Sequence, residues 1–365
     1  MALVRCWGAT CQPTIVHGSI GLVKTHGERF NRRNSFRMPN VHQGVRRSRI
    51  ARTLMKHGGR PQYDADLIAS AHLARRSIAD QFPDLEAEDA IAFGEGWDNW
   101  IYRVGDWLFR FPRGRIAVPL MEREMAILPR LAPRLPRPIP QPVFFGVPSP
   151  RYPWPFFGYS AVQGAPVAVT PLDPGKRSAS AGQLADFLQA LQTVEASEAS
   201  AWGAGEPTLG RLDIGRLKER FEVWLSAAVV RGLADADAAW VSEFRQAEAP
   251  PLSLDCPVLV HGDLNFKNVL LEPGGELAGV VDWGDLHLGH WAEDWMFAAG
   301  YFPPAGQEIF RTRIGAFDER LWRTARAVSI FVNLIVLVSA SDMGHVKDVA
   351  EARWQLRNLA ATRGS

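Results

Sequence analysis

Cysteine is scarce in this sequence. The 365 residues contain three cysteines, of which Cys6 and Cys11 lie near the N-terminus and Cys256 precedes a strand-like segment. This number and spacing do not suggest a disulfide framework. We therefore expect a reduced, cytoplasmic protein.

Long hydrophobic runs are also lacking. A membrane-spanning helix needs about 20 mostly apolar residues, and the longest candidate, AVSIFVNLIVLVSA at Ala327–Ala340, is shorter than that. We interpret this run as a buried helix. The N-terminal charges are not followed by the apolar stretch of a secretory signal. We expect no membrane partner.

Acidic residues are nearly absent from the first 60 residues. These hold 12 lysines and arginines against a single acid, whereas residues 61–365 hold 29 basic and 38 acidic groups. A basic tail can bind nucleic acid or an anionic membrane, but this one lacks helical or strand periodicity. We expect residues 1–60 to be a disordered extension with Met38 and Met55 as alternative starts, and we expect no nucleic-acid partner.

Strand-like runs dominate the next part of the chain. Helical spacing predicts a helix over Asp64–Phe82 with Asp64 as its cap, and a second, amphipathic helix over Ala117–Ala132. A hairpin turn is predicted at Val104–Asp106. The strand-like runs cover residues 89–99, 100–106, 107–113, 142–147 and 154–162. They predict a small antiparallel sheet with one helix inserted after its third strand.

The chain changes character at a connector rich in Gly, Pro and Ser, Gln163–Ser180. Helical patterns dominate beyond it, and a short β segment, Val258–Trp283, interrupts them. The predicted helices begin with Ala181–Ser197, Ile214–Arg231 and Ala234–Gln246. The sequence therefore predicts an α+β protein with a sheet-based lobe at residues 61–163 and a larger helical lobe at residues 164–365.

Polar residues gather between two apolar strands in VHGDLNFKNVLL, Val260–Leu271. Asp263 and Asn268 flank this loop, and Asp282 ends the next apolar strand. A buried acid is unfavourable unless something pairs with it. Single Asp and Asn residues often cap turns, but two acids and an amide that converge on one loop favour a hard cation with oxygen ligands, Mg²⁺.

The first lobe offers features suited to a nucleotide. Gly94 and Gly96 in GEGWDN would let backbone N–H groups approach phosphates. Arg110 lies between two phenylalanines in the third strand, where we expect it to face inward and to need an anion. Glu124 on the following helix is a suitable partner, and a triphosphate is a suitable ligand.

Together these segments resemble the aminoglycoside phosphotransferase family, which shares the protein-kinase fold. HGDLNFKN is similar to its catalytic loop His-Gly-Asp-x-x-x-x-Asn, and VDWGD to its second metal motif. GEGWDNWIYRV and FRFPR are similar to its phosphate loop and third strand. The resemblance covers roughly residues 65–345. It implies a kinase-like two-lobed fold and Mg²⁺-dependent transfer of a phosphoryl group from ATP or GTP to a hydroxyl of a small molecule.

The resemblance implies roles for the residues of the catalytic loop and metal motif. Asp263 matches the aspartate that aims the acceptor hydroxyl and receives its proton. Asn268 and Asp282 match the Mg²⁺ ligands. His261 and Asp294 are expected to brace the catalytic loop rather than to react.

The resemblance also implies roles on the nucleotide side. Arg110 stands where relatives have Lys or sometimes Arg to hold the α- and β-phosphates, with Glu124 as its pair. Backbone groups of about Ala161–Gln163, before a hinge at Gly164, are expected to bind the base. Lys267 is interpreted as a surface charge.

The sequence departs from the family pattern once on the acceptor side and once on the nucleotide side. In GHWAEDW, Gly289–Trp295, His290 and Trp291 replace the usual Asp and Pro. This change puts substrate details in doubt more than phosphoryl transfer. Arg110 in place of Lys is planar and cannot lose its proton, so it should still bind phosphates.

The acceptor itself stays open. An aminoglycoside needs carboxylates, whereas a macrolide needs apolar walls. Residues 166–282 hold 17 acids against 9 basic groups, which modestly favours a cationic acceptor. Aromatic residues after the metal motif either wall an apolar pocket or, more simply, belong to the core: Trp291, Trp295, Phe297, Tyr301 and Phe302.

Other functions are compatible with the same motifs. The acceptor could be a metabolic alcohol or sugar such as choline, homoserine or an amino sugar. A nucleotide-binding pseudokinase regulator is a further alternative, which the intact metal ligands disfavour. A protein kinase is disfavoured because no Ala-Pro-Glu-like segment or long activation loop follows Asp282. We expect an antibiotic acceptor of the aminoglycoside or macrolide type and a monomer or dimer.

Overall fold

The computed structural model describes residues 66–85, 89–95, 98–169, 172–208, 210–249, 253–315 and 317–363. The predictions made for residues 1–60, for the Asp64 cap and for Gly96 fall outside these residues.

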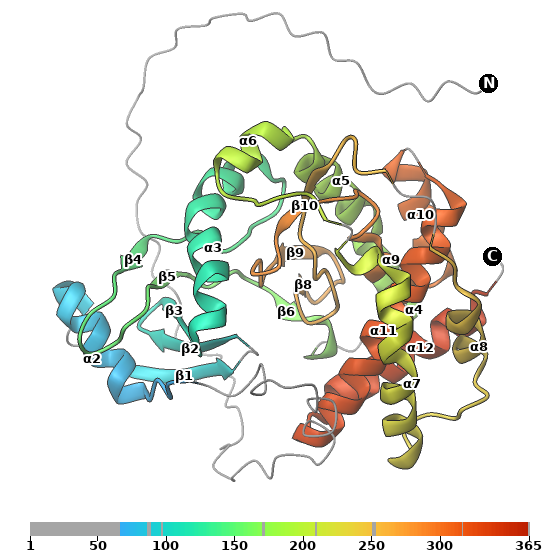
Figure 1. The fold of residues 1–365 in the computed structure, drawn as a ribbon, viewed down its shortest axis with the longest axis horizontal. Coiled ribbons are helices and arrows are strands. Elements are labelled where there is room, and N and C mark those ends of the chain that lie inside the picture. The colour runs from blue at the N-terminus through green and yellow to red at the C-terminus, as the bar shows by residue number, and fades with distance from the viewer. Residues whose placement is uncertain are drawn as a thin grey trace, which may run out of the picture. The chain divides into compact units, whose positions relative to one another are not determined.

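An antiparallel sheet forms the N-terminal lobe (Figure 1). Its strands, in the order β1-β2-β3-β5-β4, are β1 (Ala90–Glu95), β2 (Asn99–Val104), β3 (Trp107–Pro112), β4 (Phe144–Gly146) and β5 (Phe156–Ser160). Gly105 turns the predicted hairpin with a φ of 56°, which glycine adopts without strain. Helix α3 (Val118–Leu131) follows the third strand, so the predicted order of strands and helix is confirmed.

Alternation along β3 sets the direction of Arg110. Phe109 and Phe111 are fully buried on the face of the sheet that α2 (Ala71–Gln81) covers. Successive side chains of a strand point to opposite faces, so Arg110 lies on the other face, with its guanidinium 5.8 Å from the centre of the Phe157 ring. Arg110 is 4% exposed, so it faces inward as expected, although on the opposite face from its two neighbouring phenylalanines.

Helix α2 is shorter than the sequence predicts. It begins at Ala71 rather than at Asp64, because the Ser70 hydroxyl caps it by accepting a hydrogen bond from Leu73 N at 3.1 Å. A short 3-10 helix, η1 (Pro83–Leu85), follows it.

The C-terminal lobe is mainly helical. Its helices are α4 (Pro174–Arg177), α5 (Ala181–Gln192), α6 (Ala196–Ala201), α7 (Ile214–Val230), α8 (Ala239–Gln246), α9 (Trp295–Tyr301), α10 (Pro304–Ile314), α11 (Glu319–Met343) and α12 (Val346–Ala361). Two predicted boundaries were wrong. The helix predicted over Ala181–Ser197 ends at Gln192, and the one predicted from Ala234 begins at Ala239. Short polar residues such as Asp235 and Asp237 favour a turn over a helix start.

Short strands interrupt the helices and carry the polar loop. A three-stranded sheet joins β6 (Ala165–Pro166), β8 (Val269–Leu271) and β9 (Leu277–Val280), and a two-stranded one joins β7 (Val258–Val260) and β10 (His287–Gly289). The sequence ended this β segment at Trp283 and so missed β10. His287 pairs with Val260 in the ladder, which brings the chain after the metal motif back to the catalytic loop.

Helix α11 contains the longest apolar run. It is the one described helix that is long and apolar enough to cross a membrane, and 78% of its most apolar window is buried inside the fold. It packs against α12, α9 and α7, and α11 and α12 can be followed side by side in Figure 1. Its Asp318 cap accepts hydrogen bonds from the N–H groups of Arg320 and Leu321. The prediction of a buried helix is confirmed.

Candidate active site

The catalytic loop is held by backbone hydrogen bonds to one buried carboxylate. Asp294 accepts from His261 N at 2.8 Å and from Gly262 N at 3.0 Å. The carboxylate is 2% exposed and precedes α9. Asp294 thus lies where the sequence prediction placed it, against the start of the loop.

The His261 ring ties the loop to the strand that follows. Its Nε2 lies 3.0 Å from Val281 O, and its Nδ1 accepts from Asp263 N at 3.2 Å. These partners fit the neutral tautomer with the proton on Nε2. Burial lowers the pKa of His261, which favours the same neutral form. His261 therefore spans the loop and the metal motif without carrying charge.

Gly262 fits its position because no side chain could. Its φ is 80°, and a Cβ built there would lie 2.5 Å from Asp285 O and 2.9 Å from His287 Nδ1. The close approach of the loop to the segment after the metal motif requires glycine. This is a physical reason for the glycine in His-Gly-Asp.

Asp263 and Asn268 face each other across the loop. Asn268 Nδ2 donates to Asp263 O at 2.8 Å and to Asp263 Oδ2 at 3.4 Å. Asn268 O accepts from Val281 N at 2.8 Å, which links the loop to the residue before Asp282. The predicted catalytic aspartate and metal-binding amide are thus brought together.

Asp282 adopts a strained backbone conformation. Its φ of 64° is the one positive value among the described residues other than glycine. Such a conformation costs about 1–3 kcal/mol and is concentrated at functional sites. The carboxylate pairs through Oδ1 with Arg110 NH2 at 2.8 Å, while its side chain stays 54% exposed.

The Arg110 guanidinium joins the two lobes. It donates to Glu124 Oε2 on α3 at 2.7 Å and to Asp282 Oδ1 in the other lobe. Arg110 and Glu124 are 4% and 1% exposed. Burial opposes the charge of Arg110, but the Glu124 and Asp282 carboxylates outweigh it and raise the pKa of the guanidinium. The predicted pair therefore exists and reaches the metal motif directly.

Carboxylates crowd around this point. The pKa of Asp98 is raised to about 6, mainly by burial and then by the Asp282 and Asp285 carboxylates. The pKa of Asp263 is also raised to about 6, because burial together with Asp285 and Asp282 outweighs the lowering by Arg211. Carboxylates that disfavour one another's charge form a site that a cation would stabilise.

The candidate metal ligands keep free oxygen atoms. In the described part of the chain, neither Asn268 Oδ1 nor Asp282 Oδ2 takes part in a hydrogen bond or ion pair. No group of three or more His, Cys, Asp or Glu residues there could hold a metal by itself. One carboxylate and one amide fit Mg²⁺, which usually completes its shell with water and substrate phosphates.

Sequence reasoning missed Arg211. It lies in the 3-10 helix η6 (Gly210–Leu212) between α6 and α7. Its NH2 contacts Asp263 Oδ1 at 2.6 Å and Asp285 Oδ2 at 3.5 Å, and its Nε donates to Gly262 O at 2.7 Å. No local pattern marks this arginine, because its partners lie about 50 residues further along the chain.

Glu293 anchors the backbone of the Arg211 segment. It is 1% exposed and accepts from Arg211 N at 3.0 Å through Oε1. Its Oε2 lies 3.2 Å from His287 Nε2. Burial opposes the charge of His287, but Glu293 outweighs it and raises the pKa of His287. The main chain at Arg211 is therefore fixed independently of the arginine side chain.

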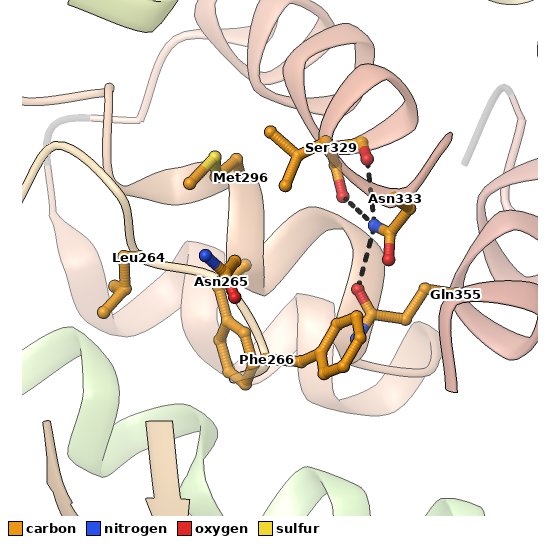
Figure 2. Close-up of a pocket in the computed structure, with 9 residues that line it drawn as sticks. Leu264, Asn265, Phe266, Met296, Ser329, Asn333 and Gln355 are labelled. Carbon is orange, nitrogen blue, oxygen red and sulfur yellow. Dashed lines mark hydrogen bonds between the residues drawn. The ribbon is translucent and has the colours of Figure 1, made fainter. Parts of the chain in front are cut away.

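A small cavity with a mixed apolar and polar lining lies beneath the catalytic loop. Figure 2 shows Leu264, Asn265 and Phe266 of the loop on one side of it and Ser329, Asn333 and Gln355 on the other. Its volume of about 10 Å³ is close to the space of one water. Asn333 Nδ2 donates to Gln355 Oε1 at 3.1 Å and to Ser329 O at 2.9 Å. The loop thus rests on a hydrogen-bonded platform of α11 and α12.

The predicted base-binding segment lies between the lobes. Ala161 is partly buried and Gln163 is exposed, and Gln163 Nε2 donates to Ala161 O at 3.3 Å. Gly164 has a φ of 100°, and a Cβ there would lie 2.5 Å from Ala278 Cβ. The hinge therefore turns tightly against β9, and the role of the Ala161–Gln163 backbone toward the base stays a prediction.

Gly94 lies in β1, where the pairing with β2 shifts register. A Cβ there would meet Ile101 Cδ1 at 3.9 Å, which is an ordinary contact. Packing within the protein does not require glycine at this position, so its expected role toward phosphates stays a prediction.

Several side chains near the motifs belong elsewhere. Lys267 Nζ lies 3.6 Å from Asp348 Oδ2 on α12, in keeping with a surface charge. Of the aromatic cluster after the metal motif, only Trp291 is partly exposed. The core members are 0–2% exposed: Trp295, Phe297, Tyr301 and Phe302. The core alternative for this cluster therefore holds.

This combination of residues defines a class of site: a carboxylate on a rigid loop, an amide and a second carboxylate for a cation, and a buried arginine for phosphates. Such a site is arranged for phosphoryl transfer.

The sequence matches the phosphotransferase enzyme family (APH) over residues 89–328, and the chain belongs to this family. It is a small-molecule phosphotransferase, as the motifs predict. No curated protein gives a significant match.

Solved structures of kinase-like phosphotransferases share the fold. The GDP and kanamycin complex of APH(2")-IIia superposes with a TM-score of 0.60 at 24% identity, over 81% of this chain and all of that one. Macrolide 2'-phosphotransferase MphH from Brachybacterium faecium gives 0.50 at 20% identity, over 78% and 97%. The streptomycin-ATP-APH(2")-IIa ternary complex gives 0.50 at 15% identity, over 80% and 99%. The predicted fold class is confirmed.

Proposed function

We propose that this protein transfers the γ-phosphoryl group of a nucleoside triphosphate, with Mg²⁺, to a hydroxyl of an aminoglycoside- or macrolide-type antibiotic. The observation that carries the proposal is the ion pair of Arg110 with both Glu124 and Asp282, set beside Asp263 and Asn268. Family membership supports the reaction class. Structural neighbours that hold GDP or ATP support a nucleotide donor.

The residues divide into donor and acceptor roles. Arg110 neutralises the α- and β-phosphates, and Glu124 holds its guanidinium in place. Asn268 and Asp282 hold Mg²⁺, which when bound screens the charge of the phosphates. Asp263 accepts a hydrogen bond from the acceptor hydroxyl and takes its proton late in the transfer. Positioning and charge neutralisation do most of the work in phosphoryl transfer.

A cationic acceptor is favoured over an apolar one. The aromatic cluster after the metal motif is mostly core, so it offers little wall for a macrolide. Asp285, by contrast, keeps its side chain 56% exposed beside Asp263. An exposed carboxylate next to the catalytic one suits an ammonium group of the acceptor. We therefore place aminoglycosides before macrolides.

A turnover assay tests the proposal. Wild type and Asp263→Asn are incubated with Mg-ATP or Mg-GTP and a panel of aminoglycosides, macrolides, choline, homoserine and amino sugars, and products are identified by mass spectrometry. Phosphorylated aminoglycoside with wild type alone is expected. A phosphorylated metabolite with untouched antibiotics would instead assign a metabolic kinase. Tight nucleotide binding without any product would assign a regulator.

A further inference from the structure

We propose that Arg211 is a second cation of the transfer site, which orients Asp263 and neutralises the phosphoryl group as it moves to the acceptor. The inference rests on the proposed function, since it concerns the same reaction. It assigns a role to a residue outside the sequence motifs, on a segment that folds back from between α6 and α7.

The contacts of Arg211 fix its guanidinium beside the reacting carboxylate. Nε donates to Gly262 O at 2.7 Å, and NH2 contacts Asp263 Oδ1 at 2.6 Å. Burial opposes the charge, but Asp263, Asp285, Glu293 and Asp294 outweigh it and raise the pKa of Arg211. The cation is thus held in its charged form, within one hydrogen bond of the atom that receives the acceptor proton.

One donor of the guanidinium remains available. In the described part of the chain NH1 makes no hydrogen bond or ion pair, and the side chain is 30% exposed. A guanidinium presents its N–H groups in a fixed fork. With Nε and NH2 held by the catalytic loop, NH1 is free to donate to a phosphoryl oxygen next to Asp263.

The segment is built to keep this geometry. Thr208 N donates to Leu288 O at 3.0 Å, Gly210 N to Thr208 Oγ1 at 2.8 Å, and Arg211 N to Glu293 Oε1 at 3.0 Å. A Cβ at Gly210 would lie 2.1 Å from Glu293 Oε1, and the φ of Gly210 is 49°. The backbone carries these contacts, so replacing the Arg211 side chain leaves its anchors intact.

The transfer exchanges one phosphorus–oxygen bond for another. The acceptor oxygen forms a bond to the γ-phosphorus, and the bond from that phosphorus to the β,γ-bridging oxygen breaks with its electron pair leaving on the nucleoside diphosphate. The hydroxyl proton passes to Asp263. Arg211 donates to an oxygen of the transferred group throughout. Preorganised cations of this kind typically contribute about 10²–10³-fold in kcat.

The test compares Arg211→Ala with Arg231→Ala. Arg231 is the matched control, because it also pairs side by side with a carboxylate, Asp342, at 2.9 and 3.0 Å, and lies at the far end of α7. For Arg211→Ala we expect kcat to fall about a hundredfold, with KM for the nucleotide and the melting temperature close to wild type. Arg231→Ala should leave kcat unchanged.

A further readout separates a reacting role from a structural one. Guanidinium ion at non-denaturing concentration should partly restore kcat in Arg211→Ala, because it can take the place of the lost side chain. A purely structural contact would give no such rescue.

Binding of Mg-ADP with fluoroaluminate, which mimics the transferred group, needs no acceptor. Arg211→Ala should lose this affinity at least about thirtyfold while keeping that for Mg-ADP. Equal affinities for wild type and variant would overturn the role of Arg211. If wild type binds the mimic but phosphorylates no member of the panel, the proposed acceptor is wrong. The difference in affinity between wild type and Arg211→Ala would still test the role of Arg211.

Discussion

Two arginines, one from each lobe, pair with the carboxylates of the site, and their supports differ. Arg110 comes from a strand of the first lobe, is 4% exposed and meets Asp282 at 2.8 Å. Arg211 comes from a short 3-10 helix of the second lobe, keeps 30% of its side chain exposed and meets Asp263 at 2.6 Å. Both outer nitrogens of the buried Arg110 pair with protein carboxylates, and its proposed ligand is the nucleotide. The partly exposed Arg211 keeps one N–H group, on NH1, available for the transferred phosphoryl group.

The two arginines are also held in place by carboxylates in different ways. Glu124 pairs with the guanidinium of Arg110 itself, while Glu293 holds the backbone of Arg211 and leaves its side chain to the catalytic loop. A buried charge that loses its partner costs much more than an exposed one. Loss of Arg110 should therefore affect folding and nucleotide binding, and loss of Arg211 should affect the chemical step.

The largest effect should come from removing the carboxylate that Arg211 orients. Asp263→Asn keeps the shape of the loop but cannot take the acceptor proton, so kcat should fall about a thousandfold. Binding of Mg-nucleotide, measured by calorimetry, should persist because Arg110 and Asp282 are untouched. Asp342→Asn, which removes the partner of Arg231, is the control and should leave turnover unchanged. A loss below tenfold would contradict the role of Asp263.

Arg110→Met should combine a loss of nucleotide binding with a loss of stability. It leaves the Glu124 carboxylate buried without its cation, which typically costs about 3–5 kcal/mol of unfolding free energy. Urea unfolding and nucleotide titration measure the two effects. Arg211→Met is the counterpart and should unfold within about 1 kcal/mol of wild type, because its carboxylate partners Asp263 and Asp285 are 23% and 56% exposed. Similar destabilisation by both substitutions would remove the distinction between the two arginines.

The two arginines also mark how far the sequence could predict this site. Arg110 and Glu124 were found because a cation inside an apolar strand needs an anion, and a helix follows directly. Asp263, Asn268 and Asp282 were found from one short loop and the strand after it. The structure brings all five together.

Arg211 could not be found in this way, because a single arginine in a turn carries no periodic signal. Its role depends on the fold of the segment onto β10, a three-residue strand that the sequence reading also missed. The order of sheet, helix and helical lobe was predicted because it follows from runs of apolar residues. Contacts between distant turns depend on packing that such runs do not encode.

The contribution of a buried carboxylate to the free energy of unfolding should depend on pH when its partner is a histidine and not when its partner is an arginine. Glu293 raises the pKa of His287 in the folded protein, so this pair stabilises the fold fully below the ordinary histidine pKa and fades as the pH rises through the folded value. Glu293→Gln should therefore lose about 1–2 kcal/mol more at pH 5.5 than at pH 9.

The counterpart is Glu351→Gln, which removes a buried carboxylate that pairs with Arg177 at 2.7 Å rather than with a histidine. Chemical unfolding at the two pH values gives the free energies for both variants. Only Glu293→Gln should show the added loss at low pH. A pH-independent loss for Glu293→Gln would show that His287 is not the titrating partner.

The smallest effect should come from Asp285, which both raises the pKa of Asp263 and shares Arg211 with it. Asp263 accepts a proton only when ionised, so kcat/KM should fall as the pH drops below about 6. Asp285→Asn removes a neighbouring negative charge, which lowers the pKa of Asp263 and should move this acid limb to lower pH by about half a unit. Asp186→Asn should not move it, because this carboxylate pairs with Arg313 and is not among the groups that shift the pKa of Asp263. If the acid limb instead moves to higher pH in Asp285→Asn, Asp285 acts mainly by holding Arg211 in place. The position of Arg211 would then depend on both of its carboxylate partners.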